Sequence, residues 1–251
     1  ATGAALFKKV NRCPGLAIAN IGDASMGCGP VWEAMNFAAM DQYHQLWEES
    51  MRGGLPMVFN FMNNFYGMGG QTDGETMGYD VLARVGAGVN PEAMHAERID
   101  GYNPLAVADA IARKRAVIEE GRGPVLLETI TYRISGHSPS DASSYRDKRE
   151  IEAWQAVDPI AAYGASLADA GLLDDAALQA CEERTVGLMR KALGLATDDA
   201  VSPRLGGEDI GAMMFSGRRA DKLADRPAEV HDLDDNPRCK QIARKHRSAR
   251  N

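Results

Sequence analysis

Short apolar runs alternate with amphipathic segments along most of the chain. Four runs are short enough for buried strands and are bounded by Gly, Pro or Asn: residues 15–21, 55–62, 96–101 and 123–134. Helical periodicity is expected between them over residues 31–51, 79–86 and 103–121. Strands that alternate with helices in this order predict an α/β fold, with a parallel sheet covered by helices on both faces.

The second half of the chain has a different pattern. Residues 135–150 form a polar loop without a hydrophobic period, and helices are expected over 159–171 and 174–194. Beyond about Asp198 the pattern decays. We therefore expect a domain over residues 1–197, whose helical C-terminal extension starts at about residue 149. An irregular tail or linker is expected over 198–251.

Composition narrows the class of protein. The chain has 251 residues, of which 45% are hydrophobic and 25% charged, as in soluble proteins with a sizeable core. Its net charge of −7 disfavours a general nucleic-acid-binding surface. No apolar run approaches the ~20 residues that span a bilayer, and no signal peptide opens the chain, so we expect no membrane partner. The four cysteines form no CxxC pair, and a cytoplasmic location is expected.

Three polar clusters follow predicted strands directly. They comprise Gly22 to Ser25, Asn63 to Gly67 and Arg133 to His137. Ligands of parallel α/β sheets bind where the carboxyl ends of the strands converge with loops and helix N-termini. The three clusters are therefore predicted to meet at one edge of the sheet.

The first cluster combines a carboxylate with a turn whose amides suit a phosphate. Asp23 alone would repel a phosphate, so the pairing predicts a metal ion between them. Mg²⁺ prefers oxygen ligands shared between carboxylates, carbonyls and phosphates. Asn64 offers an amide oxygen, and the glycine-rich loop at 67–78 offers main-chain carbonyls.

Each cluster also has a simpler interpretation. Gly22 and Asp23 suit an ordinary turn with an N-cap, Asn63 and Asn64 suit a turn with left-handed backbone, and His137 alone is typical of a surface loop. The functional interpretation depends on the conjunction of all three clusters in one chain.

Taken together, these residues resemble the thiamine diphosphate-binding motif, which begins Gly-Asp-Gly and ends Asn-Asn. More narrowly, the chain resembles the α subunit of the E1 component of 2-oxo acid dehydrogenases over roughly residues 4–195. The matching stretches, in the family's order, are "GDASMGCGPVWEAMNFAA", "LPMVFNFMNNFYGMGG", "ERIDGYNP", "GPVLLETITYRISGHSPSD" and "SSYRDKREIEAW". The resemblance implies the thiamine diphosphate-binding fold.

The resemblance also implies the roles of site residues. Mg²⁺ would be held by the side chains of Asp23 and Asn64 and the main-chain oxygen of Tyr66. His137 would lie near the reacting thiazolium carbon, with Arg133 on the same loop. The residues implied to bind the cofactor are Gly22, Asp23, Ala24, Ser25, Asn64, Tyr66, Gly67 and His137.

The implied activity is the oxidative decarboxylation of a 2-oxo acid, followed by acyl transfer to a lipoyl group of an E2 partner. The active site would lie at the interface with a β-type E1 region, separate or fused, in an α2β2-like assembly, and this chain would be inactive alone. Residues 236–251 are similar to the junction of fused forms, so we expect the chain to be part of a longer protein. "SDASSYR" corresponds to the loop that is phosphorylated in mitochondrial relatives.

The chain departs from the family pattern at four points. Ala24 stands where the motif has glycine, which requires a negative φ at that residue. The segment between the half-motifs is long, and 41–54 is interpreted as an insertion that extends the preceding helix. Ser135 replaces a histidine, and the family's N-terminal region is absent from this sequence. Two alternatives remain: an acetoin dehydrogenase E1 α subunit, and a non-catalytic assembly module that retains the fold.

Overall fold

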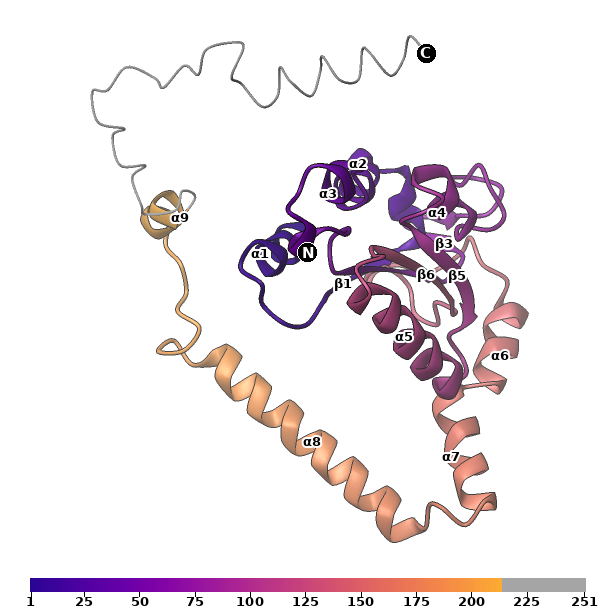
Figure 1. Cartoon of the computed structure of the whole chain (residues 1–251). Coiled ribbons are helices and arrows are strands. Elements are labelled where there is room, and N and C mark those ends of the chain that lie inside the picture. Colours follow the sequence, from indigo (N-terminus) through magenta and orange to yellow (C-terminus); the bar gives the residue numbers. More distant parts are fainter. Residues whose placement is uncertain (214–251) are drawn as a thin grey trace, which may run out of the picture. The chain divides into compact units, whose positions relative to one another are not determined.

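The central feature of the fold is a parallel sheet of four strands. The computed structural model describes residues 1–213. Its strands are β1 (Ala17–Gly22), β2 (Met57–Asn63), β5 (His95–Asp100) and β6 (Val125–Ile130), in the order β1-β2-β6-β5 (Figure 1). All three strand pairs are parallel, which confirms the predicted sheet.

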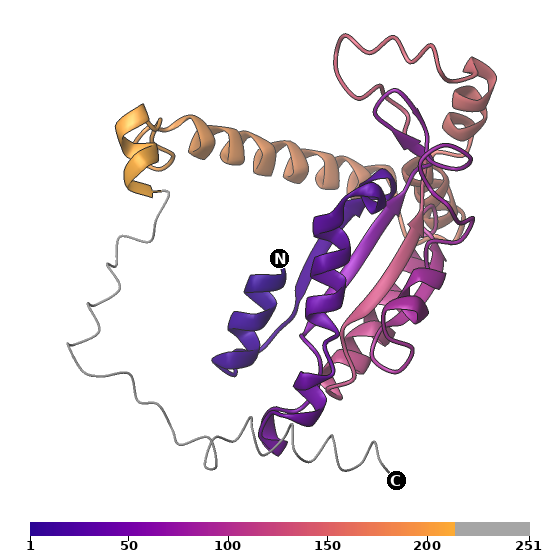
Figure 2. The ribbon, with the colours of Figure 1, turned by 90° about the horizontal axis from the view of Figure 1, so that it is seen from above.

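Helices cover both faces of this sheet, as predicted (Figure 2). One core lies between the strands and helices α1 (Thr2–Val10), α2 (Gly29–Ala38) and α4 (Arg84–Val89). The other core joins the opposite face to α5 (Pro104–Glu119). Successive side chains of a strand point to opposite faces, so Phe59 packs in the first core and Val58 in the second.

The prediction of a single long helix over 31–51 is wrong. Helix α2 ends at Ala38, and a short helix α3 (Gln42–Gln45) and a 3₁₀ turn η2 (Glu49–Met51) follow it. The main-chain carbonyl of Ala38 accepts from the Leu55 amide, and that of Ala39 accepts from the Asn90 side chain. Residues 41–54, which we interpret as an insertion and call the inserted lobe, fold back on the first core instead of extending α2, and their Tyr43 is buried in that core.

Three other boundaries differ from the sequence prediction. The glycine-rich loop, expected to lack regular structure, contains a small antiparallel hairpin of β3 (Tyr66–Gly67) and β4 (Gly70–Gln71). Helix α4 lies several residues beyond the expected 79–86. Strand β6 is shorter than 123–134, because the carbonyls of Arg133 and Ile134 accept from Arg146 and leave the sheet.

Beyond β6, the described part of the chain, up to residue 213, contains four more helices. They are α6 (Lys148–Ala156), α7 (Pro159–Asp169), α8 (Asp175–Thr197) and α9 (Gly207–Met213). Contacts divide the chain into one unit of Ala1–Asp175 and a second that starts at Ala176, and the boundary expected at residue 197 stays a prediction. No helix within residues 1–213 has the length and apolar character needed to cross a membrane. Cys239 and the junction-like segment 236–251 lie outside the described residues.

A buried carboxylate connects the strands at the centre of the sheet. Glu128 on β6 is fully buried, and its Oε1 accepts from Asn63 Nδ2 at 2.8 Å and from Arg98 at 2.7 Å. Its Oε2 accepts from the Ala83 main-chain amide at 2.8 Å. Burial alone would raise the pKa of Glu128, but these donors outweigh it and hold the pKa below its ordinary value.

We expect Glu128→Gln to destabilise the chain by ~2–4 kcal/mol, because one acceptor is replaced by an NH₂ group among three donors. Since the pKa of Glu128 is lowered by folding, its contribution is complete above the ordinary value of 4.5 and is lost as the pH falls below it. Urea unfolding of the chain at pH 7 and at pH 4 measures both effects. The matched control is Glu33→Gln on the exposed side of α2. An equal loss of stability in the two variants would contradict the role of Glu128.

Candidate functional site

The parallel topology places the three polar clusters at one edge of the sheet. Strand β1 ends at Gly22, and the 3₁₀ turn η1 (Asp23–Gly27) follows it directly. Strand β2 ends at Asn63, before the hairpin that contains Tyr66 and Gly67. The loop with Arg133 and His137 follows β6. Each predicted site residue therefore emerges from the carboxyl end of a strand.

Asp23 is the buried carboxylate of this edge, with 1% of its surface exposed. Its Oδ2 accepts from the Thr72 hydroxyl at 2.5 Å. Its Oδ1 is buried and has no hydrogen-bond partner among residues 1–213. Burial raises the pKa of Asp23, and the hydroxyl of Thr72 and main-chain amides of Asn64, Asp23 and Ala24 offset that rise only in part.

The two adjacent asparagines at the end of β2, Asn63 and Asn64, have different roles. Asn63 is buried and its side-chain amide donates to Glu128, so it belongs to the sheet. Asn64 remains in the loop, where its Oδ1 accepts from the main-chain amide of Tyr66 at 3.2 Å. An amide oxygen has two lone pairs, so one acceptor position on Asn64 remains for a further donor or a cation. Phe65, between Asn64 and Tyr66, has a φ of 67°, which turns the chain sharply.

The turn after β1 packs closely against the hairpin. Ala24 lies within η1, and the non-glycine residues with positive φ in the described chain are Arg12, Phe65 and Ser143. The negative φ that Ala24 requires is therefore present. A Cβ added at Gly67 would lie 3.0 Å from the Ala24 methyl, so residue 67 has to remain small. Ser25 holds the turn, because its carbonyl accepts from the Cys28 amide at 2.9 Å.

His137 is held by its own loop. The Oδ2 of Asp141 accepts from the His137 main-chain amide at 2.8 Å and from the Tyr145 hydroxyl at 2.7 Å. The same hydroxyl lies 3.1 Å from Nδ1 of His137. The amide of His137, the hydroxyl of Tyr145 and the amide of Ser143 together lower the pKa of Asp141 to about 2. Asp141 is therefore ionised at neutral pH.

Arginine side chains connect this loop to the hairpin. Arg133 donates to the Gly136 carbonyl at 3.2 Å and closes the turn before His137. Arg146 is buried, donates to the carbonyl of Arg133, and lies 5.3 Å from the centre of the Tyr66 ring. The Tyr66 ring in turn lies 6.0 Å from that of Tyr145. Tyr66 thus touches both the Arg146 side chain and the ring of the loop that holds His137.

Sequence reasoning did not single out several residues of this arrangement. Glu150, on α6, accepts from the Tyr66 hydroxyl at 2.8 Å, and the two residues line a cavity of about 190 Å³. Burial and this carboxylate raise the pKa of Tyr66. The residues missed are Thr72, Asp141, Tyr145, Arg146 and Glu150. All but Thr72 fall within "SDASSYRDKRE" or next to it, where the density of polar side chains was the available signal.

The site therefore offers two chemical features. One is a buried carboxylate with an unpartnered oxygen beside amide and main-chain oxygens, a donor set that suits a hard divalent cation. The other is an imidazole fixed by a hydroxyl and a carboxylate, which suits proton transfer. Within residues 1–213, no three His, Cys, Asp or Glu side chains gather as a metal-binding group.

Several known proteins are similar in sequence to this chain. The pyruvate dehydrogenase E1 component subunit alpha of Rickettsia conorii is 30% identical over 192 residues, which cover 76% of this chain and 54% of that protein. The 2-oxoisovalerate dehydrogenase subunit alpha of Bacillus subtilis is 31% identical over 202 residues, covering 80% and 55% of the two chains. A probable mitochondrial pyruvate dehydrogenase E1 component subunit alpha of Caenorhabditis elegans is 29% identical over 203 residues, covering 80% and 47%.

The chain spans about half the length of these curated relatives. The family model described as "Dehydrogenase E1 component" matches residues 1–203, which include every candidate site residue. This match confirms the resemblance inferred from the motifs. The chain belongs to the dehydrogenase E1 component family.

Proposed function

We propose that this chain supplies the cofactor-binding half of a thiamine diphosphate-dependent E1 enzyme. Asp23, Asn64 and the main-chain oxygen of Tyr66 would hold Mg²⁺. Gly22, Ala24, Ser25 and Gly67 would line the diphosphate. The observation that carries this proposal is the buried, unpartnered Oδ1 of Asp23.

The surroundings of Asp23 fit a cation better than a purely structural role. Burying an ionised carboxylate is costly unless each oxygen is paired. The Thr72 hydroxyl pairs Oδ2 and nearby main-chain amides reduce the cost further, but burial still keeps the pKa of Asp23 raised. A divalent cation would pair Oδ1, and its charge would remove the repulsion between this carboxylate and a diphosphate.

The loop after β6 supplies the acid–base group. When bound, thiamine diphosphate supplies the ring that stabilises the carbanion left by decarboxylation. Because the Tyr145 hydroxyl donates to Asp141, its oxygen accepts from Nδ1–H of His137. This tautomer leaves Nε2 of His137 free to accept a proton. Arg133 adds positive charge beside it, which favours an anionic substrate.

The proposed reaction is the oxidative decarboxylation of a 2-oxo acid with acyl transfer to a lipoyl group of E2. The names of the relatives associate them with pyruvate and 2-oxoisovalerate, which are both 2-oxo acids. We propose the matching partners, a β-type E1 region in an α2β2-like assembly and the lipoyl domain of E2, and inactivity of this chain alone. A cytoplasmic location stays a prediction, since bacterial and mitochondrial relatives both occur.

We expect Asp23→Asn to abolish Mg²⁺-dependent cofactor binding while leaving the metal-free fold at least as stable. Affinity for thiamine diphosphate with Mg²⁺ should fall about a hundredfold or more, because a charged ligand of the cation is lost. The metal-free melting temperature should stay equal or rise, because an unpaired buried charge is removed. Calorimetry on the chain assembled with its β-type partner measures the first effect, and thermal unfolding of the chain measures the second.

The control for this variant is Asp109→Asn on the exposed face of α5. It should leave both quantities within experimental error of the unmodified chain. Unchanged cofactor affinity in Asp23→Asn would exclude the metal assignment. A melting temperature that falls sharply without metal would instead assign Asp23 a structural role.

Replacing His137 should lower turnover much more than it lowers affinity for the cofactor. We expect His137→Gln to lower kcat of the assembled enzyme about 10²–10⁴-fold, because general acid–base groups contribute on that scale. Tyr145→Phe should give a smaller loss, since it removes the oxygen that accepts from Nδ1 but keeps the imidazole. Cofactor titrations run in parallel should show little change in either variant. A His137→Gln enzyme with normal kcat would contradict the assignment.

A further inference from the structure

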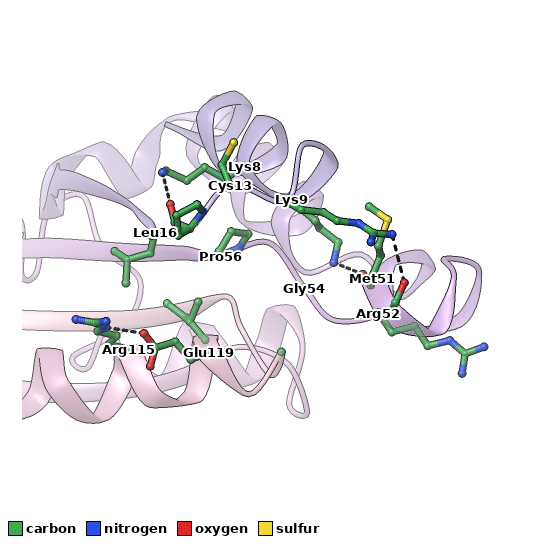
Figure 3. A pocket seen from close by; sticks show the side chains of 16 residues that line it. Lys8, Lys9, Cys13, Leu16, Met51, Arg52, Gly54, Pro56, Arg115 and Glu119 are labelled. Atoms are coloured by element: carbon green, nitrogen blue, oxygen red, sulfur yellow. Dashed lines mark hydrogen bonds and ion pairs between the residues drawn. The ribbon is translucent and has the colours of Figure 1, made fainter.

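A second cavity lies at the amino ends of the strands, on the edge of the sheet opposite to the proposed cofactor site. Its volume is about 630 Å³, within the range of small-molecule sites. Leu16 and Pro56, which precede β1 and β2, form one wall, and the end of α5 forms the other (Figure 3). Residues 50–54 of the inserted lobe close one end.

The charge of this cavity is opposite to that of the whole chain. Its cationic side chains are Lys8, Lys9, Arg12, Arg52 and Arg115. Among the described residues that line the cavity, Glu119 is the one acidic side chain, so these residues carry an excess of four positive charges in a protein whose net charge is −7. Concentrated positive charge inside a concave site attracts and retains anions.

Three of these cations, Lys9, Arg52 and Arg115, already have structural partners. Arg52 Nε donates to the Trp47 carbonyl at 3.2 Å. Lys9 donates to the Met51 carbonyl at 2.5 Å, and its ammonium lies 4.9 Å from the centre of the Trp47 ring. It therefore ties the inserted lobe to α1, and burial lowers its pKa. Arg115 is paired with Glu119 at 2.7 Å.

Lys8 and Arg12 have fewer close hydrogen-bond partners. Lys8 donates to the Pro14 carbonyl at 2.9 Å, which uses one of its three protons. Arg12 makes only long contacts within the described chain, at 3.4 Å to Ser50 Oγ and 4.0 Å to Glu48. Both side chains therefore keep donors for a ligand.

The inserted lobe is held firmly where it borders the cavity. A Cβ at Gly53 or Gly54 would collide with the main chain of Gly121 or Gly123, so these glycines bring two segments into direct contact. Tyr43 is buried and its carbonyl accepts from the Gly53 amide at 3.1 Å. The insertion thus forms a packed end wall of the cavity.

We propose that this cavity binds a small organic phosphate monoester. Lys8 and Arg12 would contact the phosphate, whose two negative charges match an excess of positive charge better than one carboxylate does. The apolar part of the ligand would pack against Leu16, Pro56 and Ile118. This second site is separate from the cofactor site and does not depend on the proposed function.

Calorimetry of the full chain without Mg²⁺ tests the proposal with three probes: AMP, inorganic phosphate and adenosine. AMP should bind most tightly, because it combines the charge with an apolar ring system. Phosphate should bind more weakly, and adenosine most weakly. Equal affinity for all three probes, or no heat from AMP at millimolar concentration, overturns the proposal.

Substitutions that remove either positive or negative charge from the cavity test whether AMP binds there. Lys8→Gln/Arg12→Gln should weaken AMP binding about 10- to 100-fold, since charge-assisted hydrogen bonds to the phosphate are lost. Glu119→Gln, at an exposed position, should tighten it several-fold by removing the one acidic group. The charge-matched control Arg184→Gln/Arg190→Gln on α8, outside the cavity, should leave it unchanged.

Three outcomes overturn the assignment. A control variant that weakens AMP binding as much as Lys8→Gln/Arg12→Gln would show unspecific attraction. Glu119→Gln without any gain in affinity would place the anion elsewhere. Loss of AMP binding in Asp23→Asn would place it at the cofactor site, whereas unchanged AMP binding there supports a separate site, whether or not Asp23 binds Mg²⁺.

Discussion

The buried carboxylate of Glu128 is the constraint on which the edge of the sheet depends. Its oxygens accept from Asn63 at the end of β2, from Arg98 on β5 and from the amide of Ala83 before α4. One side chain on β6 therefore fixes three segments that are distant in sequence. A buried charge is tolerated only when its partners are all in place, so these segments assemble together or not at all.

The position of the candidate site follows from this anchoring. Because Asn63 is held by Glu128, the chain turns at Phe65, and Asn64 and Tyr66 are presented in the loop. The hairpin then packs against the turn after β1, where Gly67 leaves space for the Ala24 methyl. Ala24 is therefore compatible with the backbone of η1, and its side chain constrains residue 67 rather than the main chain of the motif.

The sheet and the edge at which the polar clusters meet could be predicted from the sequence. Short apolar runs indicate the strands, and parallel strands all end at the same edge of a sheet. The sequence did not predict that helix α2 stops at Ala38. That end depends on hydrogen bonds from Leu55 and Asn90, and pairings over such separations leave no periodic trace. The partners of His137 were missed for a related reason: Asp141 and Tyr145 looked like ordinary loop residues until the loop closed on itself.

Two buried carboxylates at this edge, Glu128 and Asp23, differ in their hydrogen-bond partners, and this difference distinguishes a structural role from a candidate ligand role. Glu128 and Asp23 are both almost inaccessible to water, yet folding lowers the pKa of the first and raises that of the second. The difference comes from pairing, because both oxygens of Glu128 accept from protein donors whereas Oδ1 of Asp23 is left without one in the described chain. The unpaired oxygen of Asp23 is therefore best explained by a positive partner from outside the chain, which is the role we propose for Mg²⁺.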